Sequence, residues 1–247
     1  MNNPLYFFFI PAIILSQEVQ SNLPIIIINT DNQTILDDPR VVCDMGIINN
    51  PHITNNSTDD YNEYDGKISI ELRGSTSQSF PKKSYSFETQ NVKGENNNIS
   101  LLGLPEENDW ILYAPYSDKT MLRNVLSYSL SEKMGNYAPR TRFCELIINN
   151  EYQGVYVLTE KIKRDKNRVN IKEIEEADIT GGYIIKIDRP ASGSLESQWA
   201  TNSTAVSGGT LYCQYHYPKS SDINDEQKEY IKNFIDHTIE IINTSEL

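Results

Sequence analysis

Cysteine and histidine are scarce in this sequence. Only three cysteines occur in 247 residues, and Cys43, Cys144 and Cys213 show no CxxC or Cys/His spacing, which excludes a zinc site or a thioredoxin-type redox pair. The odd count also gives no disulfide framework. We expect the three thiols to be buried small hydrophobes, although one pair is free to oxidise if the chain is exported. The three histidines share no spacing that indicates a site.

Basic residues are few as well. The chain has 22 Lys and Arg against 34 Asp and Glu, a net charge of -12 at pH 7. This excess disfavours non-specific binding to nucleic acid or anionic lipid, so we expect no nucleic-acid partner. With 12 Gly, 11 Pro and 38% hydrophobic residues, collagen-like and wholly disordered chains are excluded and a globular protein is expected.

Long apolar runs are absent except at the N-terminus, where residues 5–15 read LYFFFIPAIIL. This run has the length of a signal-peptide core and is too short to span a bilayer, so residues 1–20 are a possible signal peptide. Its flanks are poor, because no Lys or Arg precedes it and Pro11 interrupts it. A misplaced start or a buried strand is the alternative. We expect no transmembrane span in the mature chain.

Alternating apolar residues predict two strands, at residues 67–73 and 83–89, on either side of a Gly/Ser loop. An N-cap at Asp118 and a C-cap at Gly135 bound a predicted helix, and residues 225–242 have the pattern of a second, amphipathic helix. We therefore predict an α+β fold with a mostly antiparallel sheet. Further strands are predicted at residues 23–30, 41–48, 109–114, 143–149, 154–159, 183–188 and 208–212.

Five sequence blocks, in this order and spacing, resemble the CotH kinase family. The strongest block reads ELRGSTSQSFPKKSYSFET, and the others contain DWILYAPYSDKTMLRN, YAPRTRFCELIINNEYQGVYVLTEKIKRDKNRVNI and TGGYIIKID. Together they cover about residues 21–190. The blocks lie at residues 21–38, 71–89, 109–124, 137–171 and 180–188.

The resemblance implies an atypical protein-kinase-like fold over residues 21–247, an N-lobe with one or two packed helices and a largely absent C-terminal lobe. It implies transfer of a phosphoryl group from ATP, with Mg²⁺, to a serine of a partner protein. It also implies a bacterial protein that is secreted or located at the cell envelope or spore surface, as in spore-coat members of the family.

The loop after the first alternating strand is the predicted phosphate contact. A backbone-lined Gly/Ser turn flanked by cations presents N–H groups and positive charge to a triphosphate. Such turns are also common as solvated hairpin tips, and this alternative stays open. The predicted contacts are Arg73, Gly74, Ser75, Ser77, Lys82 and Lys83.

Three further residues complete the predicted cofactor site. Arg123 lies on a helix that we expect to be buried, so it is either an ion-pair partner, with Glu160 as one candidate, or a phosphate ligand. Glu160 ends a predicted strand and is a candidate to hold a lysine such as Lys161, as kinase glutamates do. A surface charge run at the strand end is the alternative.

One family feature is missing. Family members carry an asparagine-aspartate and a tryptophan-aspartate segment that resemble the catalytic base and Mg²⁺ ligand of kinases, and neither follows residue 225. We therefore expect a truncated chain that is inactive alone, and we assign no catalytic residue and no metal ligand. A non-catalytic extracellular binding or scaffold module is the alternative function. A carbohydrate-binding domain, which fits the tyrosine and asparagine content, ranks third.

Overall fold

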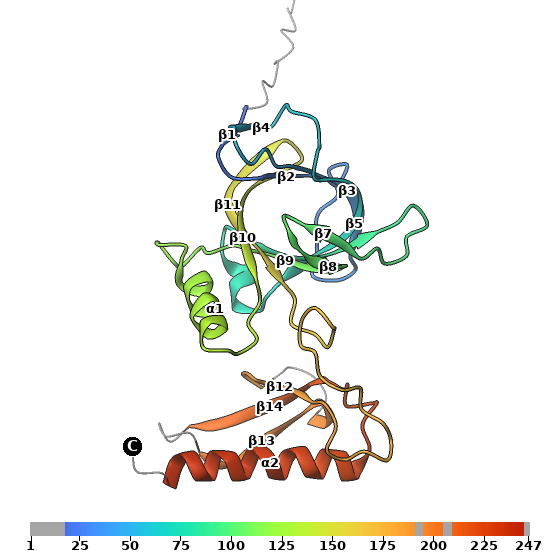
Figure 1. The fold of residues 1–247 in the computed structure, drawn as a ribbon, viewed down its shortest axis with the longest axis vertical. Helices are drawn as coiled ribbons and strands as arrows, with labels where there is room; N and C mark the ends of the chain where they lie inside the picture. The colour runs from blue at the N-terminus through green and yellow to red at the C-terminus, as the bar shows by residue number, and fades with distance from the viewer. Residues whose placement is uncertain (1–17, 191–194, 205–208, 245–247) are drawn as a thin grey trace, which may run out of the picture. The chain divides into compact units, whose positions relative to one another are not determined.

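Seven strands form a closed barrel in the N-terminal part of the computed structural model (Figure 1). Their order is β10-β11-β9-β6-β5-β3-β2, and among these pairs only β10 and β2 run parallel. The structure describes residues 18–190, 195–204 and 209–244, so the apolar run at residues 5–15 lies outside it. The barrel strands are β2 (Ile25–Asn29), β3 (Val41–Ile48), β5 (Tyr64–Arg73), β6 (Ser84–Gln90), β9 (Asp109–Tyr113), β10 (Thr141–Ile148) and β11 (Glu151–Glu160).

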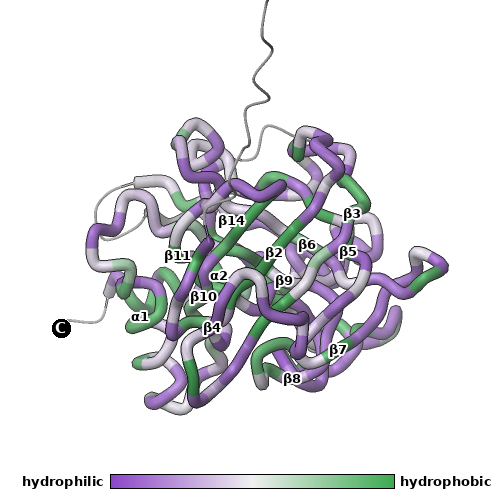
Figure 2. Tube along the Cα trace, turned by 90° about the horizontal axis from the view of Figure 1, so that it is seen from above, coloured by the Kyte–Doolittle hydropathy of each residue, from purple (hydrophilic) through white to green (hydrophobic). Residues whose placement is uncertain are grey.

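The barrel interior is filled by alternate residues of these strands. Ile68 and Ile70 of β5 are fully buried, as are Trp110 of β9 and Tyr156 of β11. Because side chains alternate across a strand, the residues between them point outward and are free to be polar. In Figure 2 the apolar run of β2 is visible as a continuous hydrophobic segment.

The predicted α+β class with a mostly antiparallel sheet is confirmed. Closure of the sheet into a barrel was not predicted, because it depends on a parallel pairing between Ile25 of β2 and Glu145 of β10, which are far apart in the sequence. Local alternation shows which residues form strands and gives no partner for such distant pairs.

The turn between β10 and β11 is tighter than expected. We predicted a connection through residues 150–153, but β11 already begins at Glu151 and only Asn149 and Asn150 form the turn. Both have a positive φ, 50° and 65°, as a two-residue type I′ hairpin requires, and asparagine tolerates this conformation.

Two small ribbons accompany the barrel. β1 (Gln20–Ser21) pairs with β4 (Asn55–Asn56), and β7 (Ile99–Leu101) pairs with β8 (Leu104–Glu107). None of these four short strands was predicted, since each is too short to show a period.

Helix α1 (Arg123–Lys133) corresponds to the first predicted helix, but its caps differ from the prediction. The N-cap is Leu122 instead of Asp118, and the C-cap is Met134, which is followed by Gly135 with a φ of 84°. The expectation that α1 is packed in the core is wrong, because none of its residues is buried. Its apolar side chains include Leu126 and Leu130, which are 57% and 52% exposed.

The described residues divide into two compact units, within Met1–Lys161 and within Ile162–Leu247. The second unit has a three-stranded antiparallel sheet with the order β12-β14-β13 and a helix that packs on β13. The helix buries Ile231 and Ile239. Its elements are β12 (Ile184–Ile187), η2 (Leu195–Ser197), β13 (Gln198–Thr204), β14 (Thr210–Tyr217) and α2 (Asp225–Thr244).

The three cysteines are buried and free, as predicted. Burial raises the pKa of the Cys43 and Cys144 thiols to about 12 and also raises that of Cys213. No helix of the described residues combines the length and the apolar composition needed to cross a membrane.

We predict that Phe87→Ala lowers the free energy of unfolding of the barrel by about 3–5 kcal/mol, because this ring is 1% exposed in the core and its removal leaves a cavity. Val92→Ala, at a site 98% exposed, is the control and should change it by less than about 0.5 kcal/mol. Denaturant titration in a Trp199→Phe background, followed by Trp110 fluorescence, reports on the barrel alone. Equal stabilities of the two variants would contradict the assignment of this core.

Candidate functional site

The loop from β5 to β6 holds four predicted nucleotide contacts. Arg73 ends β5, and Gly74, Ser75 and Ser77 follow in an exposed turn that contains the short 3-10 helix η1 (Thr76–Ser79). Gly74 has a φ of 114°, and a Cβ atom there would lie 2.0 Å from Ser77 Oγ. Only glycine fits this position.

The two lysines after the loop are engaged by the protein itself. Lys82 Nζ donates a hydrogen bond of 2.6 Å to the carbonyl of Val155 and lies 4.6 Å from the centre of the Tyr156 ring. Burial lowers the pKa of Lys82. Lys83 Nζ donates to the carbonyl of Gln78 at 2.6 Å. Both amines thus secure the loop, and their role as phosphate contacts stays a prediction.

Arg123 occupies the first turn of α1 and is not buried. Its side chain is 77% exposed, with Nε 3.6 Å from Oδ1 of Asp118, and its backbone N–H donates to Asp118 Oδ2 at 2.9 Å. The N–H group of Arg123 and the Thr120 hydroxyl lower the pKa of Asp118. The expected burial of Arg123 is therefore wrong, and its ion-pair partner is Asp118, because the helix begins at the surface.

Glu160 lies on the inner face of the barrel, opposite Trp110 of β9, and is 1% exposed. Arg140 holds it: the backbone N–H and Nε of Arg140 donate to Oε2 at 2.9 and 3.0 Å, and Nη2 lies 2.9 Å from Oε1. Glu160 is thus paired with an arginine and does not hold the neighbouring Lys161.

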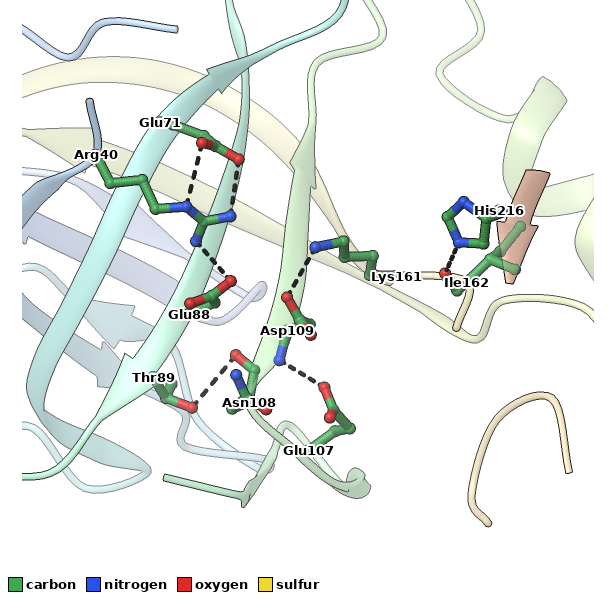
Figure 3. Close-up of polar contacts among 10 residues, drawn as sticks. All are labelled: Arg40, Glu71, Glu88, Thr89, Glu107, Asn108, Asp109, Lys161, Ile162 and His216. Carbon is green, nitrogen blue, oxygen red and sulfur yellow. Dashed lines mark hydrogen bonds and ion pairs between the residues drawn. The ribbon is translucent and has the colours of Figure 1, made fainter. Parts of the chain in front are cut away.

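Lys161 follows the end of β11 and points to the outer side, because neighbouring residues of a strand alternate. There it joins a row of charged side chains that crosses β11, β9, β6 and β5 and ends at a residue before β3 (Figure 3). We call this row the outer band. It consists of Arg40, Glu71, Glu88, Asp109 and Lys161.

Short ion pairs connect the outer band. Lys161 Nζ donates to Asp109 Oδ1 at 2.9 Å, and Arg40 donates through Nε and Nη2 to both oxygens of Glu71 at 3.1 and 2.8 Å. Arg40 Nη1 also lies 3.1 Å from Glu88 Oε1. The Lys161 side chain remains 35% exposed, whereas that of Asp109 is 11% exposed, so a shielded carboxylate orients an accessible amine.

Two carboxylates meet at the centre of the outer band, where Glu88 and Asp109 are cross-strand partners. Burial is the main cause that raises the pKa of Glu88, against the lowering effect of Arg40. The charge of Asp109 and a side-chain hydrogen bond with Asp109 raise it further. Like charges at one point of a sheet are unfavourable, so Arg40 and Lys161 are needed on either side.

The structure does not bring the predicted contacts into one cluster. The loop with Arg73 and Lys83 lies at the Ser84 end of β6, whereas Lys161 lies beside Asp109, the partner of Glu88. Glu88 lies four residue steps along β6 from Ser84, a distance of about 13 Å.

The other four members of the outer band were not among the predicted site residues. Glu71 and Glu88 occupy the polar positions of the two alternating strands, and this is the signal that would have placed them on the outer face. Arg40 lies outside any predicted strand, and nothing in the local pattern indicates its partners.

The described residues contain no group of three or more His, Cys, Asp or Glu that would hold a metal ion. The pair of Glu88 and Asp109 is occupied by Arg40 and Lys161. Within the part of the chain that the structure describes, no side-chain cluster therefore fits Mg²⁺.

A family model described as CotH kinase protein matches residues 70–246. The chain belongs to the CotH kinase family. The match begins after the first resembling block, at residues 21–38, and continues beyond residue 190 to the end of α2. The matched residues include every predicted nucleotide contact and every member of the outer band except Arg40. A search of curated proteins finds no match.

We expect Arg140→Met to lower the free energy of unfolding by about 2–4 kcal/mol, because it leaves the Glu160 carboxylate buried without its cation. This range allows for the 32% exposure of the arginine side chain. Lys67→Met, which breaks the exposed pair with Asp44, is the control and should leave the unfolding midpoint nearly unchanged. If Arg140→Met unfolds at the wild-type denaturant concentration, the pair has no structural role.

We also expect Glu88→Gln to gain stability relative to the wild type as the pH rises. The pKa of Glu88 is raised in the folded state, so the folded protein binds more protons than the unfolded protein, and the wild type loses stability as the pH rises through and above 4.5. Glutamine does not titrate. Melting temperatures of both proteins between pH 4 and 8 test this, and a difference independent of pH would refute it.

Proposed function

We propose that this chain carries the ATP-binding part of a CotH-type protein serine kinase with a kinase-like arrangement, and that Lys161 contacts the phosphates of ATP. In the reaction, the bond from the γ-phosphorus to the bridging oxygen breaks, ADP leaves, a bond to a serine Oγ of a partner protein forms, and the serine proton passes to water. Family membership supports the reaction class and a protein substrate. It also supports the proposed location, secreted or at the envelope or spore surface.

The observation that carries the proposal is the pair formed by Lys161 and Asp109. Phosphoryl transfer depends on cations held in position against the triphosphate, and a lysine fixed by a carboxylate supplies such a cation. Lys161 has this arrangement, with its amine 2.9 Å from a carboxylate that is shielded from solvent. Lys82 and Lys83 donate to backbone carbonyls instead, which makes Lys161 the stronger candidate.

The loop from β5 to β6 is the second proposed contact. Gly74, Ser75 and Ser77 offer backbone and hydroxyl groups on an exposed turn, and Arg73 adds a positive charge beside it. The two proposed contacts with the nucleotide lie at different positions along β6. The loop is at the Ser84 end, and Lys161 lies beside Asp109, the partner of Glu88.

A non-catalytic binding or scaffold module is the second candidate function. It is favoured by the internal use of three cations near the proposed site, since Lys82, Lys83 and Arg40 all form bonds within the fold. In this alternative the outer band stabilises the barrel and has no ligand.

We predict that Lys161→Met weakens ATP binding by about 10- to 100-fold, because a charged hydrogen bond is worth about 1.5–3 kcal/mol. Isothermal titration calorimetry of the whole chain, with and without Mg²⁺, measures this. Asp109→Asn should weaken binding less, since the amine remains but is no longer fixed by charge. Lys67→Met is the matched control and should bind as the wild type does, because Lys67 pairs with Asp44 outside the band.

Phosphoserine on a serine-rich peptide library, detected by mass spectrometry after incubation with ATP, tests transfer. ATP binding that depends on Lys161, without transfer, would keep the nucleotide site and remove the kinase activity from the proposal. No ATP binding by a folded chain would overturn the proposal in favour of the scaffold module.

A further inference from the structure

The centre of the outer band holds two acidic side chains in contact with each other. Glu88 and Asp109 are cross-strand partners, and their side chains are only 25% and 11% exposed. They form a side-chain hydrogen bond with each other. Two ionised carboxylates are both acceptors, so this bond requires a proton on one of them. The pair therefore holds one shared proton over part of the pH range.

The charged neighbours of the pair leave a negative charge to be balanced. Arg40 Nη1 lies 3.1 Å from Glu88 Oε1, but its Nε and Nη2 donate to the two oxygens of Glu71. Lys161 Nζ lies 2.9 Å from Asp109 Oδ1. Within the outer band, three carboxylates thus face two cations. One proton on the central pair balances the charge of these five side chains.

Two further neighbours of the pair supply no cation. The β5 residue opposite Glu88 is Ser69, which is 4% exposed and whose hydroxyl has no hydrogen-bond partner among the described residues. Beside Asp109, the carboxylate of Glu107 accepts the Asp109 backbone N–H at 2.6 Å. Neither residue neutralises the ionised pair.

A phosphate group at Lys161 changes this balance. The Lys161 side chain is 35% exposed and that of Asp109 is 11% exposed, so a ligand reaches the amine more readily than the carboxylate. A bound phosphate competes with Asp109 for the amine and brings further negative charge close to the pair. Both effects disfavour the ionised carboxyl groups, so the pair holds its proton more firmly when phosphate is bound.

We propose that Glu88 and Asp109 take up a proton when phosphate binds to Lys161, so that the outer band couples the affinity for ATP to pH. This inference rests on the proposed function of Lys161. By linkage, a ligand whose complex binds more protons than the free protein binds more tightly as the pH falls. Burial raises the pKa of Glu88 in the free protein, which extends the coupling above the pH range in which an ordinary glutamate titrates.

Glu88→Gln tests the coupling, because glutamine does not titrate and offers an N–H group to Asp109, as the protonated glutamic acid does. Isothermal titration calorimetry of the whole chain with ATP, in two buffers of different ionisation enthalpy, counts the protons taken up. At about pH 6 the wild type should take up more protons than Glu88→Gln, by at most one. The comparison also subtracts the proton exchange of ATP itself.

Affinity gives a second readout of the same experiment. At about pH 8, where the wild-type pair is ionised, Glu88→Gln should bind ATP about two- to five-fold more tightly than the wild type. Asp44→Asn is the matched control, because it removes one exposed carboxylate that pairs with Lys67 outside the outer band. This variant should retain the proton uptake and the ATP affinity of the wild type.

The outcomes separate this inference from the proposed function. ATP binding that is lost in Lys161→Met, with equal proton uptake by the wild type and Glu88→Gln, would overturn the coupling and leave the proposed function intact. No ATP binding by a folded chain would overturn both.

A measurement without ATP tests the shared proton by itself. In carboxyl ¹³C NMR of the whole chain, the signals of Glu88 and Asp109 should change over the same pH range, and Asp109→Asn should alter the titration of Glu88. Separate titrations, each unaffected by substitution of the other residue, would overturn the proposal whether or not ATP binds.

Discussion

Strand β2 is the element on which the barrel depends, because it pairs with β3 along one edge and with β10 along the other. Its short run of isoleucines is buried on both faces. Ile26 and Ile28 point into the barrel core, whereas Ile25 packs outside it with Val19 and Ile147. A strand covered on both sides needs apolar residues at every position, which explains why β2 does not alternate. The small ribbon that includes β1 supplies part of this outer cover.

The outer band follows from the order of β11, β9, β6 and β5 as direct neighbours in the sheet. Outward positions of neighbouring strands lie side by side, so charged residues there come within ion-pair distance. Arg40 joins Glu71 to Glu88, and Lys161 joins Asp109 to the end of β11. The acidic pair at the centre makes both cations necessary. The positions of Arg40 and Lys161 therefore have a structural role in the barrel in addition to any role in a binding site.

Much of the fold could be predicted from local pattern, and the site much less. Alternation in β5 and β6, and the amphipathic period of α2, depend on residues that are close in the sequence. The partners of Glu160 and Arg123 depend on which face each residue occupies. For Arg123, apolar neighbours on a helix indicated burial, yet Leu126 and Leu130 are more than half exposed. β13 escaped prediction because its residues, QWATNST, show no clear alternation.

The buried cysteines give the two units separate chemical reporters. Cys43 and Cys144 belong to the barrel and Cys213 to the second unit, and all three thiols are shielded and held in the protonated form at neutral pH. Because only the thiolate reacts with alkylating reagents, modification requires local or global opening of the surrounding structure. The rate at which each thiol is labelled therefore measures how often its own unit opens. The opening of the two units can thus be followed independently in the unmodified protein.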